Sequence, residues 1–504
     1  MQEELKYGFS RNVDATRLAR RVSWLLTTGR KQKASEELVC GMYRMGGVYI
    51  KFVQILSNLL PGFPGITPQI KSVIFDQAPV DFPLDLDAVL QAELPEVELM
   101  RFTKINRQPI GSGSFAVVYE ATLDNSEDII IKVLRPGMMR QLKTDMRNLR
   151  LLSYAAQPII RSDLVNMREV YKDYRRTVMQ EVDYMKEASN AVALAQQLKD
   201  DPGIKIPHTH TKLCTANILV QEKVDGLALS KLLELKESGV DPENYVMERL
   251  GSNLNLQLQN LGYSLLKSSI EGPHIYGDPH PGNIVLMRDD QLSIIDFGLL
   301  LPKFRSPFAI SQVWEGDLAA ALKEDVDIAE HTLKVFRLYS TKTFQALDRL
   351  ALEMRSLDIM GEIRKLLSTL ASPHIERIKK DYKSGLGIPG GSLLEAVNGA
   401  NNRFAIAVDE PTARIARAFS QYWRAMMQLN IAHKVNAGVH LRMRAFMDQN
   451  PALIKDNLPP LSLEESAEIV VDWFGKLYER DPLLFEPIFA KIRESLHTNA
   501  KLTN

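Results

Sequence analysis

The residues best suited to chemistry lie between 276 and 298, where the sequence reads Tyr-Gly-Asp-Pro-His-Pro-Gly-Asn and, thirteen residues after that asparagine, Asp-Phe-Gly. Asp278 precedes Asn283 by five positions, and Asp296 opens the second motif. In one class of phosphoryl-transfer sites, a catalytic aspartate has this spacing to a metal-binding asparagine, and a later Asp-Phe-Gly supplies a second metal ligand. A proline-rich turn followed by a coincidental Asp-Phe-Gly is the alternative. Both motifs in this order favour a site for ATP and Mg²⁺, with Asp278 as the catalytic residue and Asn283 and Asp296 as metal ligands.

The segments around these acids predict how they are positioned. Pro279 and Pro281 exclude a helix, and the apolar runs 284–286 and 292–295 predict a pair of strands that ends at the site. His280 lies between the prolines and is only partly charged at neutral pH. It can either donate to a phosphate or fix the loop through a hydrogen bond, and we favour the second role.

A glycine-rich segment at 109–118 reads Pro-Ile-Gly-Ser-Gly-Ser-Phe-Ala-Val-Val. Glycines let backbone amides approach phosphates closely. A dinucleotide-binding fold is excluded because its glycine loop opens a helix, whereas this one leads into β-branched residues. The pattern of a P-loop, GxxxxGK[ST], does not occur. The residues of the segment that we expect to contact the nucleotide are Gly111, Ser112, Gly113, Ser114 and Val118.

A lysine follows this loop on a predicted strand. The runs 117–122 and 129–134 flank a polar turn and predict a hairpin, with Lys132 on its second strand. In phosphoryl transfer such a lysine binds the α- and β-phosphates and is held by a helical glutamate. The helical pattern over 164–199 places Asp183, Glu187 and Asn190 on one face, and Glu187 is the predicted partner, although a solvated acidic face is the alternative. Lys132 and Glu187 therefore join Asp278 as candidate catalytic residues.

The composition is that of a globular protein with more than one core, since 45% of the 504 residues are hydrophobic and 25% are charged. The 62 basic residues equal the 62 acidic ones, so no nucleic-acid partner is predicted. Two distant cysteines, without a CxxC motif or secretory segment, predict an intracellular, reducing setting. No uninterrupted apolar window of about 18 residues occurs, so we expect no transmembrane helix and a cytoplasmic or peripheral membrane location.

Two local features bear on membrane binding and on metal binding. Residues 1–35 carry eight basic and three acidic side chains, a net charge of +5. The arginines there flank Leu18 and Val22 at helical spacing, so this helix either lies on an anionic membrane surface or packs on the protein with solvated arginines. His208 and His210 have no matching acid or cysteine pattern, so the sequence does not predict a metal site there.

The segments just described resemble the UbiB-like (AarF-domain) atypical kinases, a group linked to ubiquinone biosynthesis and isoprenoid-lipid homeostasis. The resemblance spans roughly residues 40–305. It is carried by the motif at 277–283, by Gln-Glu-Val-Asp-Tyr at 180–184 with the Glu187 region, and by Lys-Val-Leu-Arg-Pro-Gly at 132–137. The resemblance implies an α+β, bilobal protein-kinase-like fold that uses ATP and Mg²⁺.

The predicted organisation adds a helical N-terminal extension and a helical C-terminal tail to this fold. The expected parts are the extension at 1–95, a small lobe at 96–225, a helical large lobe with the catalytic loop at 226–440, and the tail at 441–504. The extension has Pro/Gly breaks at 61–65 and 78–83. Between the lobes, the strand-to-linker segment at 217–226 places Glu222 and Val224 where we expect contact with the nucleotide. The last 200 residues carry no recognisable signature, and no membrane anchor is expected there.

The family also has an N-terminal Lys-x-Gly-Gln motif that folds over the nucleotide site. Here the segment reads Lys51-Phe-Val-Gln54, with valine in place of the glycine. The resemblance implies that Lys51 contacts the acidic motif of Glu181 and Asp183 and occupies the place of a protein substrate. These four residues, Lys51, Gln54, Glu181 and Asp183, are therefore expected to be regulatory.

One departure from the family concerns the phosphate loop. Most members have an alanine-rich loop where this chain has Gly111 and Gly113. Because glycine widens the range of backbone conformations, the chain is expected either to transfer phosphate more readily than its relatives or to bind ATP in another pose.

Three functions are consistent with these observations. The first is a Mg-ATP-dependent UbiB-like kinase or ATPase that acts in isoprenoid-quinone or lipid-linked metabolism. The second is a protein Ser/Thr kinase, which the glycines favour and the lack of His-Arg before Asp278 opposes. The third is a scaffold that ATP switches without turnover. The expected partners are ATP, a lipid or quinone-pathway substrate, and an anionic membrane surface.

Overall fold

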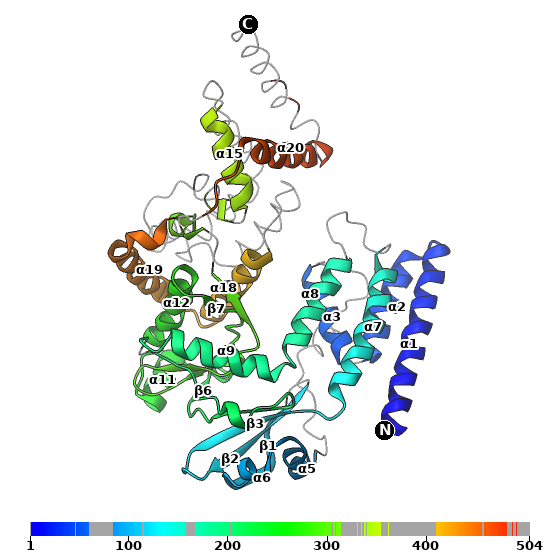
Figure 1. Cartoon of the computed structure of the whole chain (residues 1–504), viewed down its shortest axis with the longest axis vertical. Helices are drawn as coiled ribbons and strands as arrows, with labels where there is room; N and C mark the ends of the chain where they lie inside the picture. The colour runs from blue at the N-terminus through cyan, green and yellow to red at the C-terminus, as the bar shows by residue number, and fades with distance from the viewer. Residues whose placement is uncertain are drawn as a thin grey trace. The chain divides into compact units, whose positions relative to one another are not determined.

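The computed structural model describes most of the chain, in two compact units. The described residues are 2–59 apart from 46, 84–157 apart from 113 and 114, 167–303 apart from 202, 410–480 apart from 456 and 457, and short pieces between 306 and 361, together with 486 and 490. Unit 1 comprises 1–192 and 207–223, and unit 2 comprises 193–206 and 224–504 (Figure 1). The Pro/Gly breaks predicted at 61–65 and 78–83 lie outside the described residues. The bounds of the four predicted domains stay predictions.

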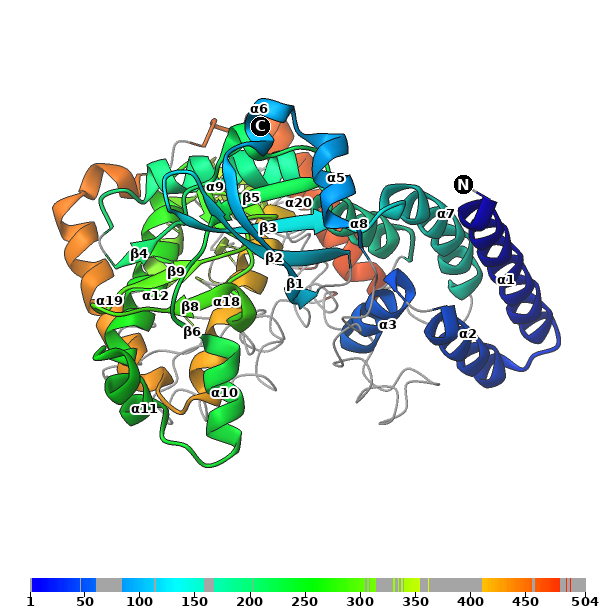
Figure 2. The same cartoon turned by 90° about the horizontal axis from the view of Figure 1, so that it is seen from below.

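Unit 1 contains an antiparallel sheet in the order β1-β2-β3-β5. Its strands are β1 (Phe102–Ser112), β2 (Ala116–Leu123), β3 (Asp128–Leu134) and β5 (Ile218–Glu222). Burial alternates along β2, as expected for a strand with one face in a core. Residues 117 and 133 belong to this core, together with α5 (Leu86–Glu93), which lies over the sheet (Figure 2). The predicted β2–β3 hairpin is confirmed.

A second core in unit 1 is helical. It is built mainly by α1 (Gln2–Thr27), α2 (Lys31–Met45), α3 (Val48–Leu59), α7 (Met138–Ala156) and α8 (Met167–Gln180). Figure 1 shows α1 beside α2 and α7. The buried hydroxyl of Tyr49 donates to a carboxylate oxygen of Asp145 over 3.2 Å, which ties α3 to α7.

The packing of α1 bears on its predicted membrane contact. Leu18, Val22 and Leu25 are buried in the helical core, whereas Arg17, Arg20 and Arg21 are exposed. The apolar face of α1 is therefore occupied by protein, and the interpretation of a packed helix with solvated arginines is favoured. Among the described residues, no helix combines the length and apolarity needed to cross a bilayer.

One predicted helix is wrong in its bounds. The pattern at 164–199 predicts a single helix, but the chain forms α8 up to Gln180 and a separate α9 (Tyr184–Gln197). The break arises because a carboxylate oxygen of Asp183 accepts a hydrogen bond from the amide of Lys186 over 3.1 Å, which caps the new helix. Asp183 therefore precedes α9, and Glu187 lies in the first turn of that helix.

Unit 2 combines a small sheet with helices. The sheet has the order β4-β9-β8-β6, and a separate pair joins β7 to β10. These strands are β4 (Ile204–Lys205), β6 (Leu227–Ala228), β7 (His274–Tyr276), β8 (Ile284–Leu286), β9 (Leu292–Ile294) and β10 (Leu300–Pro302). The described helices of eight or more residues are α10 (Leu229–Glu237), α11 (Pro242–Leu250), α12 (Leu254–Ile270), α15 (Thr341–Glu353), α18 (Glu410–Gln428), α19 (Ala432–Gln449) and α20 (Leu463–Arg480). The predicted α+β class is confirmed.

Candidate functional site

In unit 2 the β8–β9 hairpin brings the candidate metal ligands to one end. Ile284 pairs with Ile294, so Asn283, just before β8, and Asp296, just after β9, lie at the same end of the hairpin. The amide of Ile295 donates to the carbonyl oxygen of Asn283 over 3.0 Å and closes this end. The strand pair predicted from the sequence is confirmed.

The loop before β8 joins Asp278 to Asn283. The side-chain amide of Asn283 donates to the main-chain oxygen of Asp278 at 3.1 Å and to its carboxylate at 3.3 Å. His280 accepts a hydrogen bond from the amide of Gly282 at its Nδ1 atom over 3.1 Å, which confirms that it fixes the loop. Gly277 begins this loop, and a Cβ atom there would lie 2.7 Å from Leu299, so a larger residue would displace that side chain.

The oxygen atoms at this end of the hairpin fit Mg²⁺. Asp296 accepts a hydrogen bond from the amide of Gly298 over 3.0 Å through one carboxylate oxygen, which orients the side chain. Asn283 uses its amide nitrogen in the bonds to Asp278, and its amide oxygen is the atom able to bind a cation. Carboxylate and amide oxygens are the hard ligands that Mg²⁺ prefers.

In unit 1 three candidate nucleotide contacts form one row across the sheet. Gly111 pairs with Val118, Val118 pairs with Lys132, and Lys132 pairs with Leu219. Residues directly opposite each other in paired strands point to the same face. This face is opposite the one that packs against α5, because residues 117 and 133 belong to that core.

Lys132 is held by an acid from α9. Its ammonium lies 2.8 Å from the carboxylate of Glu187, and the side chains are only 16% and 4% exposed. The contact predicted from the helical pattern is therefore present, although Glu187 reaches it from the first turn of α9. A part-buried ion pair of this kind fixes the direction of the ammonium group. The role of the pair in nucleotide binding stays a prediction.

The N-terminal segment contacts both an acid and the phosphate loop. The ammonium of Lys51 lies 2.6 Å from the carboxylate of Glu181 and 4.7 Å from the centroid of the Phe115 ring. Of the two acids in the expected motif, Glu181 makes this contact, whereas Asp183 caps α9. Phe115 was not singled out from the sequence, and its place two residues after Gly113 was the only available signal.

The structure describes only some of the remaining candidate residues. Gly113 and Ser114, together with the side chains of Ser112 and Gln54, lie outside the described residues. Glu222 ends β5, where its amide donates to the carbonyl oxygen of His208 over 2.8 Å. Val224 is the first residue of the second segment of unit 2.

Comparison with known proteins identifies the region that contains most of these residues. The model of the ABC1 atypical kinase-like domain matches residues 74–309. This part of the chain is an ABC1 atypical kinase-like domain. It contains all the candidate site residues except Lys51 and Gln54, which precede it.

The relatives of the ABC1 domain include bacterial and plant proteins. A probable protein kinase UbiB of Sodalis glossinidius is 26% identical over 289 residues, which are 56% of this chain and 51% of that protein. An uncharacterised protein of Clostridium pasteurianum, from the hydrogenase 1 5′ region, is 30% identical over 58% of this chain and 51% of its own length. Activity of BC1 complex kinase 1 of Arabidopsis thaliana is 31% identical over 42% of this chain and 29% of that protein. The resemblance to UbiB-like kinases is confirmed, and the chain spans about half the length or less of these relatives.

A substitution at Gly111 would test the role of the glycine loop without changing the fold. A Cβ atom at Gly111 would meet only Val118, at an ordinary contact distance of 3.9 Å. We therefore expect Gly111→Ala to leave thermal unfolding unchanged but to lower autophosphorylation by up to about 100-fold, because misplacing a reacting group by 1 Å can cost that much. Gly475→Ala, at a position with open space around it, is the control. An unchanged rate in Gly111→Ala would exclude a role for this glycine in seating the phosphates.

Proposed function

We propose that the chain is a Mg-ATP-dependent, UbiB-like atypical kinase or ATPase. The observation that carries the proposal is the joining of Asp278, Asn283 and Asp296 at one end of the β8–β9 hairpin. In this proposal Asp278 orients or deprotonates the acceptor hydroxyl or water, and Asn283 and Asp296 hold Mg²⁺. The ion would neutralise charge on the phosphates of ATP.

The sheet of unit 1 supports the nucleotide part of the proposal. Lys132 would pair with the α- and β-phosphates, and its contact with Glu187 would hold it in position. Gly111 to Ser114 would present backbone amides to the phosphates, and Val118, Glu222 and Val224 would contact the rest of the nucleotide. We infer that these roles are performed in a bilobal, protein-kinase-like fold, which the family resemblance implies.

The substrate class is proposed from the resemblance alone. The resemblance to the UbiB-like kinases, a group linked to ubiquinone biosynthesis, supports an acceptor in isoprenoid-quinone or lipid-linked metabolism. A protein acceptor is the second candidate, because the UbiB relatives are named probable protein kinases and because Gly111 and Gly113 resemble the loop of protein kinases. A peripheral membrane contact would involve the exposed arginines of α1, since its apolar face is buried.

The test is ATP turnover by the purified full chain. We expect turnover that requires Mg²⁺ and stops on addition of EDTA. Added protein substrate and anionic liposomes form separate arms: phosphate on the protein favours the protein kinase, and stimulation by liposomes favours a lipid-linked role. Tight ATP binding without turnover in any arm would contradict the proposal and favour the nucleotide-switched scaffold.

The contacts of Lys51 predict an inhibitory role for the N-terminal segment. The Lys51 ammonium links α3 both to Glu181 and to Phe115 of the phosphate loop. We expect Lys51→Ala to raise turnover on an added protein substrate by at least about fivefold, the lower range of coupling between sites. Arg44→Ala, which removes an exposed ion pair with Glu37 elsewhere in unit 1, should change nothing. Equal rates in Lys51→Ala and the wild type would contradict inhibition by this segment.

A further inference from the structure

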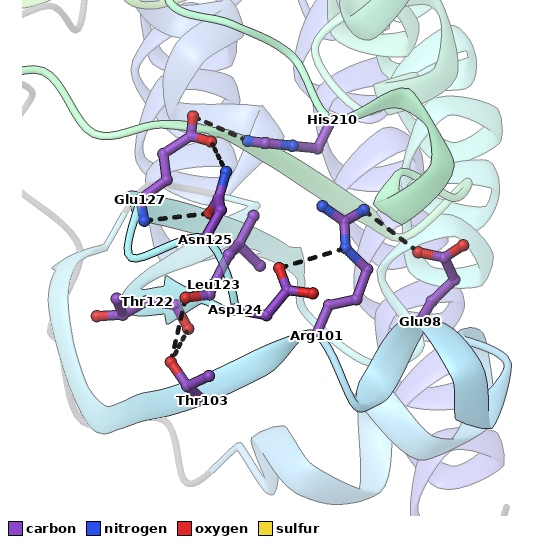
Figure 3. Close-up of polar contacts among 9 residues, drawn as sticks. All are labelled: Glu98, Arg101, Thr103, Thr122, Leu123, Asp124, Asn125, Glu127 and His210. Atoms are coloured by element: carbon purple, nitrogen blue, oxygen red, sulfur yellow. Dashed lines mark hydrogen bonds and ion pairs between the residues drawn. The ribbon is translucent and has the colours of Figure 1, made fainter.

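A cluster of two histidines and one glutamate lies in unit 1, away from the row of candidate nucleotide contacts. Nitrogen atoms of His208 and His210 and a carboxylate oxygen of Glu127 all lie within 4.8 Å of one another. The Nε2 atom of His210 is 3.2 Å from the Glu127 carboxylate (Figure 3). None of these side chains has a role in the proposed phosphoryl transfer.

The backbone holds both histidines in place. The chain at 208–210 runs beside β5: the amide of His210 donates to Val220 over 3.0 Å, and the amide of Glu222 donates to His208 over 2.8 Å. Thr209 forms an isolated bridge with Gln221 in the same antiparallel sense. Residues two apart in extended chain point to the same side, and the two imidazole rings lie 4.5 Å apart between centroids.

The glutamate is held from the opposite side by the β2–β3 turn. The amide of Leu123 donates to the carbonyl oxygen of Glu127 over 2.9 Å, and Ser126 has a left-handed φ of 64° that closes the turn. The second carboxylate oxygen of Glu127 accepts a hydrogen bond from the side-chain amide of Asn125 over 3.1 Å. Figure 3 shows Glu127 directed toward His210, and the ligand atom of His208 lies within 4.8 Å of both groups.

The charges around the cluster favour a cation. Arg101 is the nearby cation in Figure 3, and it pairs with Glu98 at 3.5 Å and with Asp124 at 3.8 Å. Arg101 is thus paired with two other carboxylates, whereas the Glu127 carboxylate faces His210.

We propose that Glu127, His208 and His210 bind a divalent transition metal ion of the zinc class. Two imidazole nitrogens and one carboxylate oxygen are a donor set that Zn²⁺ takes in proteins, with water in the fourth position, whereas Mg²⁺ and Ca²⁺ prefer oxygen ligands alone. Tetrahedral ligands about 2.0–2.1 Å from zinc lie roughly 3.4 Å apart. The pair of Glu127 and His210 already meets this spacing at 3.2 Å, and the exposed side chain of His208 needs only to turn inward.

Such an ion would join the β2–β3 turn to the chain beside β5. That chain contacts Glu222, the last residue of β5. The next residue, Lys223, donates its amide to the carbonyl oxygen of Asp128 at the start of β3 over 2.9 Å. An ion that binds only the folded sheet stabilises that sheet by linkage. The proposed site would therefore stiffen the strand end that carries Glu222.

The test is zinc binding to the full chain, stripped of metal and kept free of nucleotide. We expect one equivalent of Zn²⁺ by isothermal titration, with Co²⁺ giving visible bands typical of tetrahedral coordination. Mg²⁺ at the same concentration should not compete. His208→Ala and Glu127→Gln should weaken Zn²⁺ binding by more than about 10-fold, because even outer partners of zinc ligands change affinity by about 10- to 100-fold.

The control separates this cluster from other histidines. His433→Ala removes an exposed histidine of α19 and should leave Zn²⁺ affinity unchanged. His208 is itself exposed, so its replacement by alanine is compatible with folding, which circular dichroism would verify. Equal Zn²⁺ affinity in His208→Ala and the wild type would overturn the proposal and leave only a hydrogen bond between His210 and Glu127. An equal loss in His433→Ala would overturn it as well, since binding would then be adventitious.

Discussion

Asp278→Asn is expected to lower kcat for ATP turnover by about 100- to 10,000-fold, the usual contribution of a general base. The amide has the shape of the carboxylate but cannot take up a proton or attract an acceptor hydroxyl as strongly. The loop should persist, because the amide of Asn283 also donates to the main-chain oxygen of Asp278, which the change does not alter. ATP affinity should therefore change little, and steady-state kinetics beside calorimetric ATP binding would separate the two effects.

Asp289→Asn is the matched control for this variant. Asp289 is exposed in the turn between β8 and β9 and has a left-handed φ of 58°, which asparagine adopts as readily. It should turn over ATP at the wild-type rate. ATP turnover at the wild-type rate in Asp278→Asn would remove this aspartate from the chemistry. Full biological activity of a variant that binds ATP but does not turn it over would favour the scaffold.

The parts of the candidate site that depend on short spacing could be predicted from the sequence. Asp278 and Asn283 lie in one loop, in which Pro281 opens a short 3-10 turn over Pro281–Asn283. The apolar runs on either side of the turn near Asp289 form the expected strand pair. The pairing of Lys132 with Glu187 spans 55 residues, yet it was predictable because a lysine among apolar neighbours requires an acid.

The register of the strands in unit 1 and the break between α8 and α9 could not be predicted from the sequence. Alternation along a strand has a period of two and does not say which residues face each other, so the row of Gly111, Val118 and Lys132 needed the structure. Asp183 is compatible both with a position inside a helix and with an N-cap position. The sequence pattern predicted the first, whereas the structure shows the second.

Contacts between residues far apart in the sequence were the least predictable from the sequence. Glu127 lies 83 residues before His210, in a turn whose acids are ordinary for a polar loop, so the histidines gave no metal-site signal. Lys51 was expected near Glu181 through the family resemblance, but its contact with Phe115 depends on how α3 packs in unit 1. Such contacts arise from tertiary packing, which local spacing does not specify.

Lys132→Met is expected to destabilise unit 1 by about 3–5 kcal/mol, because it removes the cation from a buried carboxylate. The Glu187 side chain is only 4% exposed, so water cannot replace the ammonium fully. Adding Glu187→Gln to Lys132→Met should restore at least about 1 kcal/mol, since the double variant no longer buries the Glu187 carboxylate without its lysine. Hydrogen exchange of the β3 amides would measure this, because it reports the opening of unit 1 separately from unit 2.

Lys223→Met is the matched control. It shows whether the loss of stability in Lys132→Met comes from the burial of its ion pair or would follow the loss of any ion pair in unit 1. Lys223 pairs with Glu120 at 3.1 Å in the same unit, but both side chains are 33% exposed. Its loss should cost at most about 1 kcal/mol, as is usual for solvated pairs. If Lys132→Met cost no more than Lys223→Met, burial of the Lys132–Glu187 pair would have no energetic consequence. Loss of ATP binding in the double variant, despite its recovered stability, would then assign the lysine to the nucleotide and not only to the fold.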